Sequence, residues 1–334
     1  MKGIMRLLAA VVVCAGAAGA RASIVIDTVP VGNAGNAGDT RYDVGGYGAV
    51  GYAFNMGKFE VTAGQYTAFL NAVAATDTYG LYNTDMGSFP NLGANIQRSG
   101  SSGSYTYSVA ADWANRPVNY VSWGDAARFA NWLHNGQPTG AQGLSTTEDG
   151  SYFLNGATSN AALMAVTRKP NATWVIPSED EWYKAAYHKN DGVTGNYWDY
   201  PTGTNAVPNN GNPGGDTGNS ANFYDGDSTI GGPYWRTNAG FLGLSDSPYG
   251  TFDQGGNVWE WNEANLFGSS RGFRGGSFNA NDLYLHASYR NGNNPTVEYY
   301  SIGFRVSEVP EPGSLAMLAF AGVGMLVRRR GLGR

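Results

Sequence analysis

The chain has 334 residues, with 21 Lys or Arg against 26 Asp or Glu, and its formal net charge is −5. Its one cysteine, Cys14, excludes a disulfide framework within the chain and a pair of reactive thiols. The 49 glycines favour turns, while 9 Trp, 21 Tyr and 14 Phe supply large buried areas, so we expect a loop-rich fold around an aromatic core.

The N-terminus is typical of a secretory signal peptide. Two basic residues precede an apolar run over residues 7–17, and small residues lie directly before Ser23. This run is too short to cross a bilayer as a helix. We expect signal peptidase to remove residues 1–22, and Cys14 with them, during export.

Residues 23–308 form one predicted domain, because no Pro/Ser-rich linker or charge run divides them. The alternating pattern over 57–61 predicts a strand, which leads into a helix. Thr62 and Gln65 match a capping box, which marks the start of that helix. Its apolar face consists of Tyr66, Phe69, Leu70 and Val73.

Two more helices are predicted by the same signals. The first begins at Ser122 and ends at Gly136, and the second begins at Ser178 with Glu181 as its capping partner. We assign the apolar faces of both helices to the core and not to a cofactor site. These faces contain Ala126, Phe129, Ala130 and Leu133, and then Trp182, Ala185 and Ala186.

Three further strands are predicted over 173–177, 272–276 and 302–306, each of them short and apolar. The chain has no internal repeat and no alternation of strands with helices. The pattern therefore predicts a mixed α+β fold, and neither a Rossmann sheet nor a barrel.

The C-terminus carries a second targeting segment. Pro310-Glu311-Pro312 precedes an apolar run over 315–327 and a cluster of arginines. Residues 309–334 thus resemble the PEP-CTERM sorting signal of Gram-negative bacteria. The resemblance implies transient anchoring in the inner membrane, cleavage by an exosortase, and release to the cell surface or extracellular matrix. Because 13 apolar residues are marginal for a spanning helix, a permanent short anchor is the alternative.

Removal of both ends makes the domain strongly acidic. The ends contain seven of the 21 basic residues and one of the 26 acidic residues, which leaves 14 against 25 and a net charge near −11. Such a surface repels phosphate backbones, so we expect no nucleic-acid partner. Cations, neutral glycans and basic protein patches are the ligands that it favours.

Six short motifs follow one another along the domain. Their order resembles that of the formylglycine-generating enzyme family, also called the sulfatase-modifying factor family. The resemblance implies that family's fold, a loop-rich variant of the C-type lectin fold with little regular secondary structure. The motifs read GKFEVT at 57–62, RPVNYVSW at 116–123, IPSEDEW at 176–182, GNVWEW at 256–261, RGGSF at 274–278 and GFR at 303–305.

The region that carries the family's chemistry differs in this chain. Members that oxidise a substrate cysteine have two cysteines after RGGSF, and the register places Ala280 and Leu285 there. Neither side chain can replace the thiolates that hold copper(I). The resemblance therefore implies the scaffold without its catalysis, and we expect no copper. His134, His188 and His286 are far apart in sequence and match no metal-binding spacing.

A calcium ion is a candidate structural cofactor. Hard cations bind amide, carboxylate and carbonyl oxygens, which Gly/Asn/Asp loops supply. The alternative is that Asn257 only stabilises a turn. Glu260 would then pair with an arginine such as Arg274 or Arg305. In the family, matching asparagines help to bind calcium, and the candidate ligands implied here are Asn222, Phe223, Asn257, Val258 and Glu260.

Two classes of function stay open. The favoured one is a noncatalytic surface or matrix protein whose lectin-like pocket binds a peptide, a glycan or another ligand. The alternative is an oxidoreductase-type enzyme that uses cysteine-independent metal chemistry on the same scaffold. The residues predicted to line the pocket are Trp261, Arg274, Ser277 and Arg290.

Overall fold

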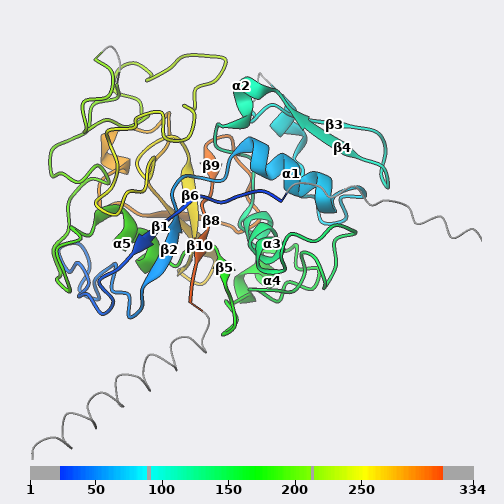
Figure 1. The fold of residues 1–334 in the computed structure, drawn as a ribbon, viewed down its shortest axis with the longest axis horizontal. Coiled ribbons are helices and arrows are strands. Elements are labelled where there is room, and N and C mark those ends of the chain that lie inside the picture. The colour runs from blue at the N-terminus through cyan, green and yellow to red at the C-terminus, as the bar shows by residue number, and fades with distance from the viewer. Residues whose placement is uncertain (1–22, 89–91, 212–213, 311–334) are drawn as a thin grey trace, which may run out of the picture.

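The computed structural model describes residues 23–88, 92–211 and 214–310. The predicted signal peptide and the part of the sorting segment beyond Pro310 lie outside these residues. Short helices and strands are joined by long loops, which confirms the α+β, loop-rich fold expected from the sequence (Figure 1). No helix in the described ranges is long and apolar enough to cross a membrane.

The three longest helices begin where the capping signals predict. Their N-cap residues Thr62, Ser122 and Ser178 each accept a hydrogen bond from the backbone N–H three residues later, and the capping box is complete in all three. These helices are α1 (Ala63–Val73), α3 (Trp123–His134) and α5 (Glu179–Tyr187). The shorter ones are α2 (Ala111–Ala114), α4 (Asn160–Ala165) and the 3-10 helices η1 (Thr84–Gly87) and η2 (Asp282–Tyr284).

The described part of the chain contains two four-stranded sheets and one hairpin. The first sheet has the order β1-β2-β10-β5 with antiparallel pairs, and the second has the order β8-β7-β6-β9, in which β6 and β9 run parallel. Strands β3 and β4 form the hairpin. The bounds are β1 Thr28–Val31, β2 Phe54–Gly57, β3 Ile96–Ser99, β4 Thr106–Val109, β5 Trp174–Val175, β6 Trp259–Leu266, β7 Ser270–Arg274, β8 Asn291–Asn293, β9 Ile302–Gly303 and β10 Ser307–Glu308.

Two of the predicted strands are misplaced. The strand predicted over 57–61 is wrong, because β2 ends at Gly57 and the next N–H, that of Lys58, donates to the carbonyl of Asp27 in a loop. Of the strand predicted over 302–306, only the first two residues form a strand, β9, and β10 begins just after the predicted range, at Ser307.

The remaining strand predictions are close to the structure. The strand predicted over 173–177 is confirmed in part as β5, and β7 overlaps the one predicted over 272–276. β7 stops at Arg274 because two glycines with positive φ follow it. The eight-residue strand β6 lies where no strand is predicted.

An aromatic cluster joins α1 and α3 to the loop after β9. The ring centroid of Phe129 lies 6.2 Å from that of Tyr66, 5.2 Å from that of Phe69 and 5.4 Å from that of Phe304. All four side chains are fully buried. Such contacts add to the stabilisation that burial of the rings provides. In Figure 1 the central strands lie between α5 on one side and α1 with α3 on the other.

Candidate functional site

Two glycine-containing loops, over residues 255–257 and 275–278, are hydrogen-bonded to each other next to the candidate site. The N–H of Gly256 donates to the carbonyl of Gly275 at 2.8 Å, and the N–H of Phe278 donates to the carbonyl of Asn257 at 3.0 Å. Gly256, Gly275 and Gly276 all have positive φ, a conformation that favours glycine. These turns direct residues 277–280 across the loop that contains Asn257.

Residues 277–280 lead into a short chain of polar contacts. The Ser277 hydroxyl donates to Oδ1 of Asn279 at 2.8 Å, and Nδ2 of Asn279 donates to the Tyr300 hydroxyl at 2.9 Å. The RGGSF motif is thereby joined to the two tyrosines that precede the GFR motif.

Aromatic rings surround this polar chain. The ring centroid of Tyr300 lies 4.3 Å from that of Tyr299 and 6.1 Å from that of Phe278, and Trp235 lies 6.5 Å from Phe278. Phe278 is buried whereas Tyr299 is 48% exposed, so the group extends from the core to the solvent. We call Trp235, Phe278, Tyr299 and Tyr300 the aromatic patch.

Buried polar side chains fix the loops that carry the aromatic patch. The guanidinium of Arg236, next to Trp235, donates to the carbonyls of residues 92 and 93 at 2.8 and 2.9 Å. Burial and the nearby Arg116 lower the pKa of Arg236 to about 9. Nδ2 of Asn119 donates to the carbonyl of residue 92 at 2.8 Å and to that of Tyr300 at 2.5 Å. These hydrogen bonds join the loops that contain residues 92–93, Trp235 and Tyr300.

The positions at which the sequence analysis expects the family's cysteine pair are apolar and packed. Ala280 is partly buried, and its carbonyl accepts a hydrogen bond from the N–H of Tyr224 at 2.9 Å. Leu285 is fully buried, and its cluster also contains Tyr200, Ala221 and Phe223.

The predicted pocket residues lie in different environments. Trp261 is fully buried, and its indole N–H donates to a backbone carbonyl at 2.9 Å. Arg274 and Arg290 meet at Glu179, to which Nε of Arg274 donates at 2.8 Å. Ser277 is buried and faces Asn279, as described above. The structure thus brings Arg274 and Arg290 together, while Trp261 and Ser277 take part in other contacts.

Two of the predicted calcium ligands, Asn222 and Asn257, are neighbours. Nδ2 of Asn222 donates to Oδ1 of Asn257 at 2.8 Å, and that oxygen also accepts from the N–H and hydroxyl of Thr237 at 3.0 and 3.2 Å. Oδ1 of Asn222 is buried and accepts no hydrogen bond within the described residues. A buried oxygen without a donor fits a cation ligand.

The carboxylate of Glu260, a third predicted ligand, already accepts hydrogen bonds on both oxygens. Its Oε2 accepts from Nε of Arg305 at 2.5 Å and from the indole N–H of Trp182 at 2.7 Å, and its Oε1 accepts from Nη2 of Arg305 at 2.7 Å. Arg305 is one of the two arginines that the sequence analysis names as an alternative partner. Phe223 and Val258, the remaining candidates, are buried next to the two asparagines, and calcium binding itself stays a prediction.

Other metal-binding arrangements are not evident. In residues 23–88, 92–211 and 214–310, no group of three or more His, Cys, Asp or Glu side chains is placed to hold a metal ion.

A pair of carboxyl groups lies directly beside the aromatic patch. Glu298, which precedes Tyr299, shares a hydrogen bond with Asp125 at the start of α3 and accepts another from Asn83. Burial and the charge of Asp125 raise the pKa of Glu298 to about 8, and burial also raises the pKa of Asp125. The raised pKa favours a protonated Glu298 at neutral pH.

Neither the aromatic patch nor the carboxyl pair follows from a sequence pattern. Trp235, Phe278 and Tyr300 come from three separate loops. Glu298 is far in sequence from Asp125, and it lies 215 residues from its hydrogen-bond donor Asn83. The adjacent tyrosines before the GFR motif are the one local sign of the patch.

Comparison with known proteins supplies the family context. The family described as the sulfatase-modifying factor enzyme 1-like domain matches residues 32–309, and the PEP-CTERM protein-sorting motif matches residues 308–330. The crystal structure of CarF is 21% identical with a TM-score of 0.50, over 86% of this chain and 99% of that chain, which shows a shared fold.

Two other solved structures are similar at lower scores. Treponema denticola variable protein 1 is 19% identical with a TM-score of 0.47, over 85% of this chain and 95% of that chain. PvdO from Pseudomonas aeruginosa is 16% identical with a TM-score of 0.44, over 85% of this chain and 91% of that chain. No curated protein matches the chain.

Proposed function

The chain belongs to the family of the sulfatase-modifying factor enzyme 1-like domain, and we propose that it is a noncatalytic, exported binding protein of the cell surface or extracellular matrix. The observation that carries this proposal is that Ala280 and the buried Leu285 are apolar, at the two positions where the resemblance to the family leads us to expect cysteines. A methyl group and an isobutyl group provide neither a nucleophilic thiolate nor a metal ligand.

The PEP-CTERM motif implies export and processing by an exosortase. In our proposal, signal peptidase removes residues 1–22, and the apolar run over 315–327 holds the protein in the inner membrane until the exosortase acts. The intact mass of protein recovered from the cell surface or medium tests this course. We expect it to lack residues 1–22 and most of the chain after Val309, and a released protein that retains 315–327 would contradict it.

The aromatic patch is the proposed ligand-binding surface. Aromatic faces with a few well-placed polar groups are typical of ligand sites. Here the exposed ring of Tyr299 lies against Tyr300, whose hydroxyl is held by the amide of Asn279. The strongly acidic domain favours a neutral glycan or a neutral or basic peptide over an anionic ligand.

Calorimetric titration of the purified domain with neutral oligosaccharides and with peptides tests this surface. We expect Tyr300→Ala and Asn279→Ala to weaken binding at least tenfold. Phe153→Ala is the matched control, because Phe153 is 55% exposed and lies outside the patch. Equal binding by all three variants would place the ligand elsewhere.

A second experiment tests the absence of the family's catalysis. The protein is incubated with a cysteine-containing sulfatase peptide, copper and oxygen, and the peptide mass is measured. We expect no change, because the thiolates needed to engage the substrate and hold copper(I) are missing. Conversion to formylglycine above background would overturn the noncatalytic assignment.

We also propose a structural calcium ion at Asn222. The support is the buried Oδ1 of this residue, which no donor satisfies within the described residues, together with its contact to Asn257. When bound, the ion would supply a positive charge that crosslinks loop oxygens. Glu260 is outside this proposed ligand set, since Arg305 and Trp182 occupy its carboxylate.

A further inference from the structure

The folded domain reaches the sorting motif without an intervening linker. Glu308 is the last residue of β10, and its carboxylate accepts a hydrogen bond from Nδ2 of Asn55 at 2.9 Å. The N–H of Val309 then donates to the carbonyl of Thr173 at 2.7 Å, and Val309 is buried. The chain is therefore fixed to the domain up to the residue before Pro310.

The apolar run begins a short distance further on. Four residues, 311–314, separate Pro310 from Leu315. Even a fully extended chain covers only about 18 Å between these two residues, at roughly 3.3–3.6 Å per residue. The headgroup layer takes up roughly 5–8 Å of this distance. While residues 315–327 are in the hydrocarbon, the end of β10 must therefore stay close to the bilayer surface.

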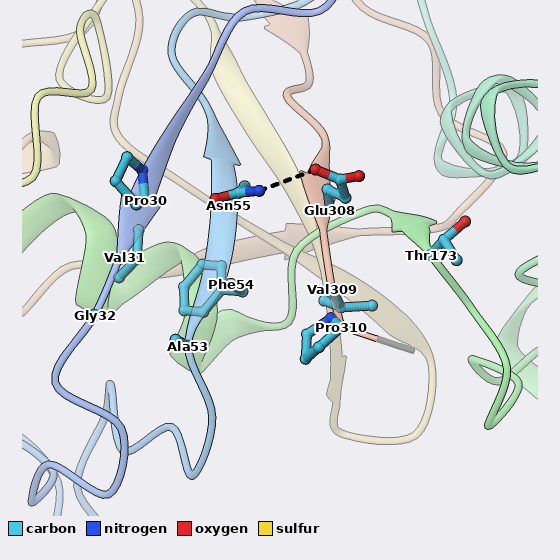
Figure 2. A pocket seen from close by; sticks show the side chains of 10 residues that line it. All are labelled: Pro30, Val31, Gly32, Ala53, Phe54, Asn55, Thr173, Glu308, Val309 and Pro310. Carbon is cyan, nitrogen blue, oxygen red and sulfur yellow. Dashed lines mark hydrogen bonds between the residues drawn. The ribbon is translucent and has the colours of Figure 1, made fainter. Parts of the chain in front are cut away.

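The surface around Pro310 is hollowed and largely apolar. Two cavities of about 380 and 280 Å³ share Val309 and Pro310 in their walls. Figure 2 shows the larger one between the ends of β1, β2 and β10. We call the rims of both cavities the tether face; its main side chains are Pro30, Tyr52, Phe54, Lys169, Pro170 and Pro310.

The charge of the tether face differs from that of the whole domain, which is near −11. Among the described residues that line the two cavities, the one carboxylate is that of Glu308, which Asn55 holds. The cations are Arg168, which is paired with Glu181 and Glu263, and the partly exposed Lys169, which is paired with Asp149 at 2.7 Å. Because these cations are paired with carboxylates, the face carries little net charge and repels anionic headgroups less than the rest of the acidic domain does.

We propose that the tether face lies against the lipid headgroups of the inner membrane while the C-terminal segment anchors the protein. This inference rests on the membrane anchoring in the proposed function. The short connection fixes which end of the domain faces the bilayer, and the apolar, acid-poor surface makes that contact favourable. The ligand-binding aromatic patch is then oriented by the fold and not by a flexible linker.

Site-specific labelling of residues 23–334, the chain without the predicted signal peptide, tests the proposal. Residues 23–334 contain no cysteine, so each introduced cysteine is unique. Ala53 and Ala111 are both exposed alanines, which makes Ala53→Cys and Ala111→Cys a matched pair. Ala53 lines the larger cavity, whereas Ala111 begins α2, which lies at the other end of the domain (Figure 1). Each variant is labelled with a bimane fluorophore and reconstituted in vesicles of phosphatidylethanolamine and phosphatidylglycerol.

Quenching by brominated lipids is the readout. We expect at least threefold stronger quenching at position 53 than at position 111. A 12-residue Gly/Ser insertion after Pro310 should reduce the difference, because it frees the domain from the surface. Equal quenching at both positions in vesicle-bound protein would overturn the inference. Flotation separates the two claims: protein that does not float with the vesicles contradicts the anchoring itself, whereas protein that floats with equal quenching contradicts the orientation alone.

Discussion

Arg305 and Glu260 form a two-point ion pair in the interior of the domain, with both side chains fully buried. The indole of Trp182 donates to the same carboxylate. The GFR, GNVWEW and IPSEDEW motifs, which are distant in sequence, therefore meet at one carboxyl group. In this chain, these residues of the three motifs form a structural junction.

Loss of one partner in this pair should be costly. Glu260→Gln removes the carboxylate that pairs directly with the buried Arg305 guanidinium, and we expect the free energy of unfolding to fall by about 3–5 kcal/mol. Urea unfolding at neutral pH measures the change. Asp149→Asn is the control, because its pair with Lys169 is about one-third exposed and should contribute less than about 1 kcal/mol. A similarly small loss for both variants would show that the buried pair is not a structural junction.

The carboxyl pair beside the aromatic patch predicts a pH dependence of stability. Burial and the neighbouring Asp125 raise the pKa of Glu298 to about 8, while Asn83 and the more distant Asp77 are the other groups that act on it. Because this pKa is higher in the folded than in the unfolded chain, the folded state binds the proton more tightly. The corresponding stabilisation is complete at low pH and is lost as the pH rises through about 8.

Melting temperatures between pH 5 and pH 9 test this expectation. Glu298→Gln keeps a hydrogen-bonding side chain without a titrating proton, so its melting temperature should fall less with rising pH than that of the parent protein. Two parallel curves would show that Glu298 titrates alike in the folded and unfolded chains.

A pair of glycines separates backbone strain from steric clash. Gly256 and Gly268 both have positive φ, at 86° and 72°. A Cβ at Gly256 would lie 2.2 Å from the carbonyl oxygen of Asn222, whereas a Cβ at Gly268 meets no atom within 4 Å. We expect Gly268→Ala to cost about 1–2 kcal/mol of stability, from the conformation alone. Gly256→Ala should cost about 2–5 kcal/mol, because Asn222 must also move. Equal losses in denaturant unfolding would argue against the tight contact between these loops.

Calcium should stabilise the parent protein and not the variants of its site. Binding to the folded state alone contributes about 2.7 kcal/mol at a calcium concentration 100 times the dissociation constant. Thermal unfolding with excess calcium and then with chelator measures this effect. Asn222→Ala should abolish it. Asn257→Gly tests the neighbouring residue without adding strain, since Asn257 has a φ of 57°. If the melting temperature of the parent protein is the same with calcium and with chelator, both asparagines have a structural role only.

The parts of the fold that depend on local interactions could be predicted from the sequence. Thr62 and Gln65 lie three residues apart and bond to each other's backbone, so the start of α1 is encoded within one turn. The end of β2 could not be predicted. The alternation in GKFEV continues after Gly57, although Gly57 is the last residue of β2 and pairs with Thr28, the first residue of β1. Glu60, which the alternation places with exposed residues, is only 1% exposed.

The candidate site depends on contacts of still longer range. The RGGSF motif points to Ser277, but Tyr300, at the other end of its chain of polar contacts, lies beyond a strand and several turns. The sequence makes Glu260 a candidate metal ligand, because it offers a carboxylate a few residues after the Gly255-Gly256 turn. Its chemistry is decided by Arg305, which is 45 residues away. Spacing along the chain contains no information on such pairings.

The position of β10 has a mechanical consequence. This strand is only two residues long, yet Ser307 pairs with Met56 on one side and with Val175 on the other. Tension applied at the C-terminus, from drag on an anchored protein or from a protease that threads the chain, would load two ladders at the same time. Neither ladder can open one bond at a time like the edge of a sheet. Pulling from this end should therefore meet more resistance than the length of the strand suggests.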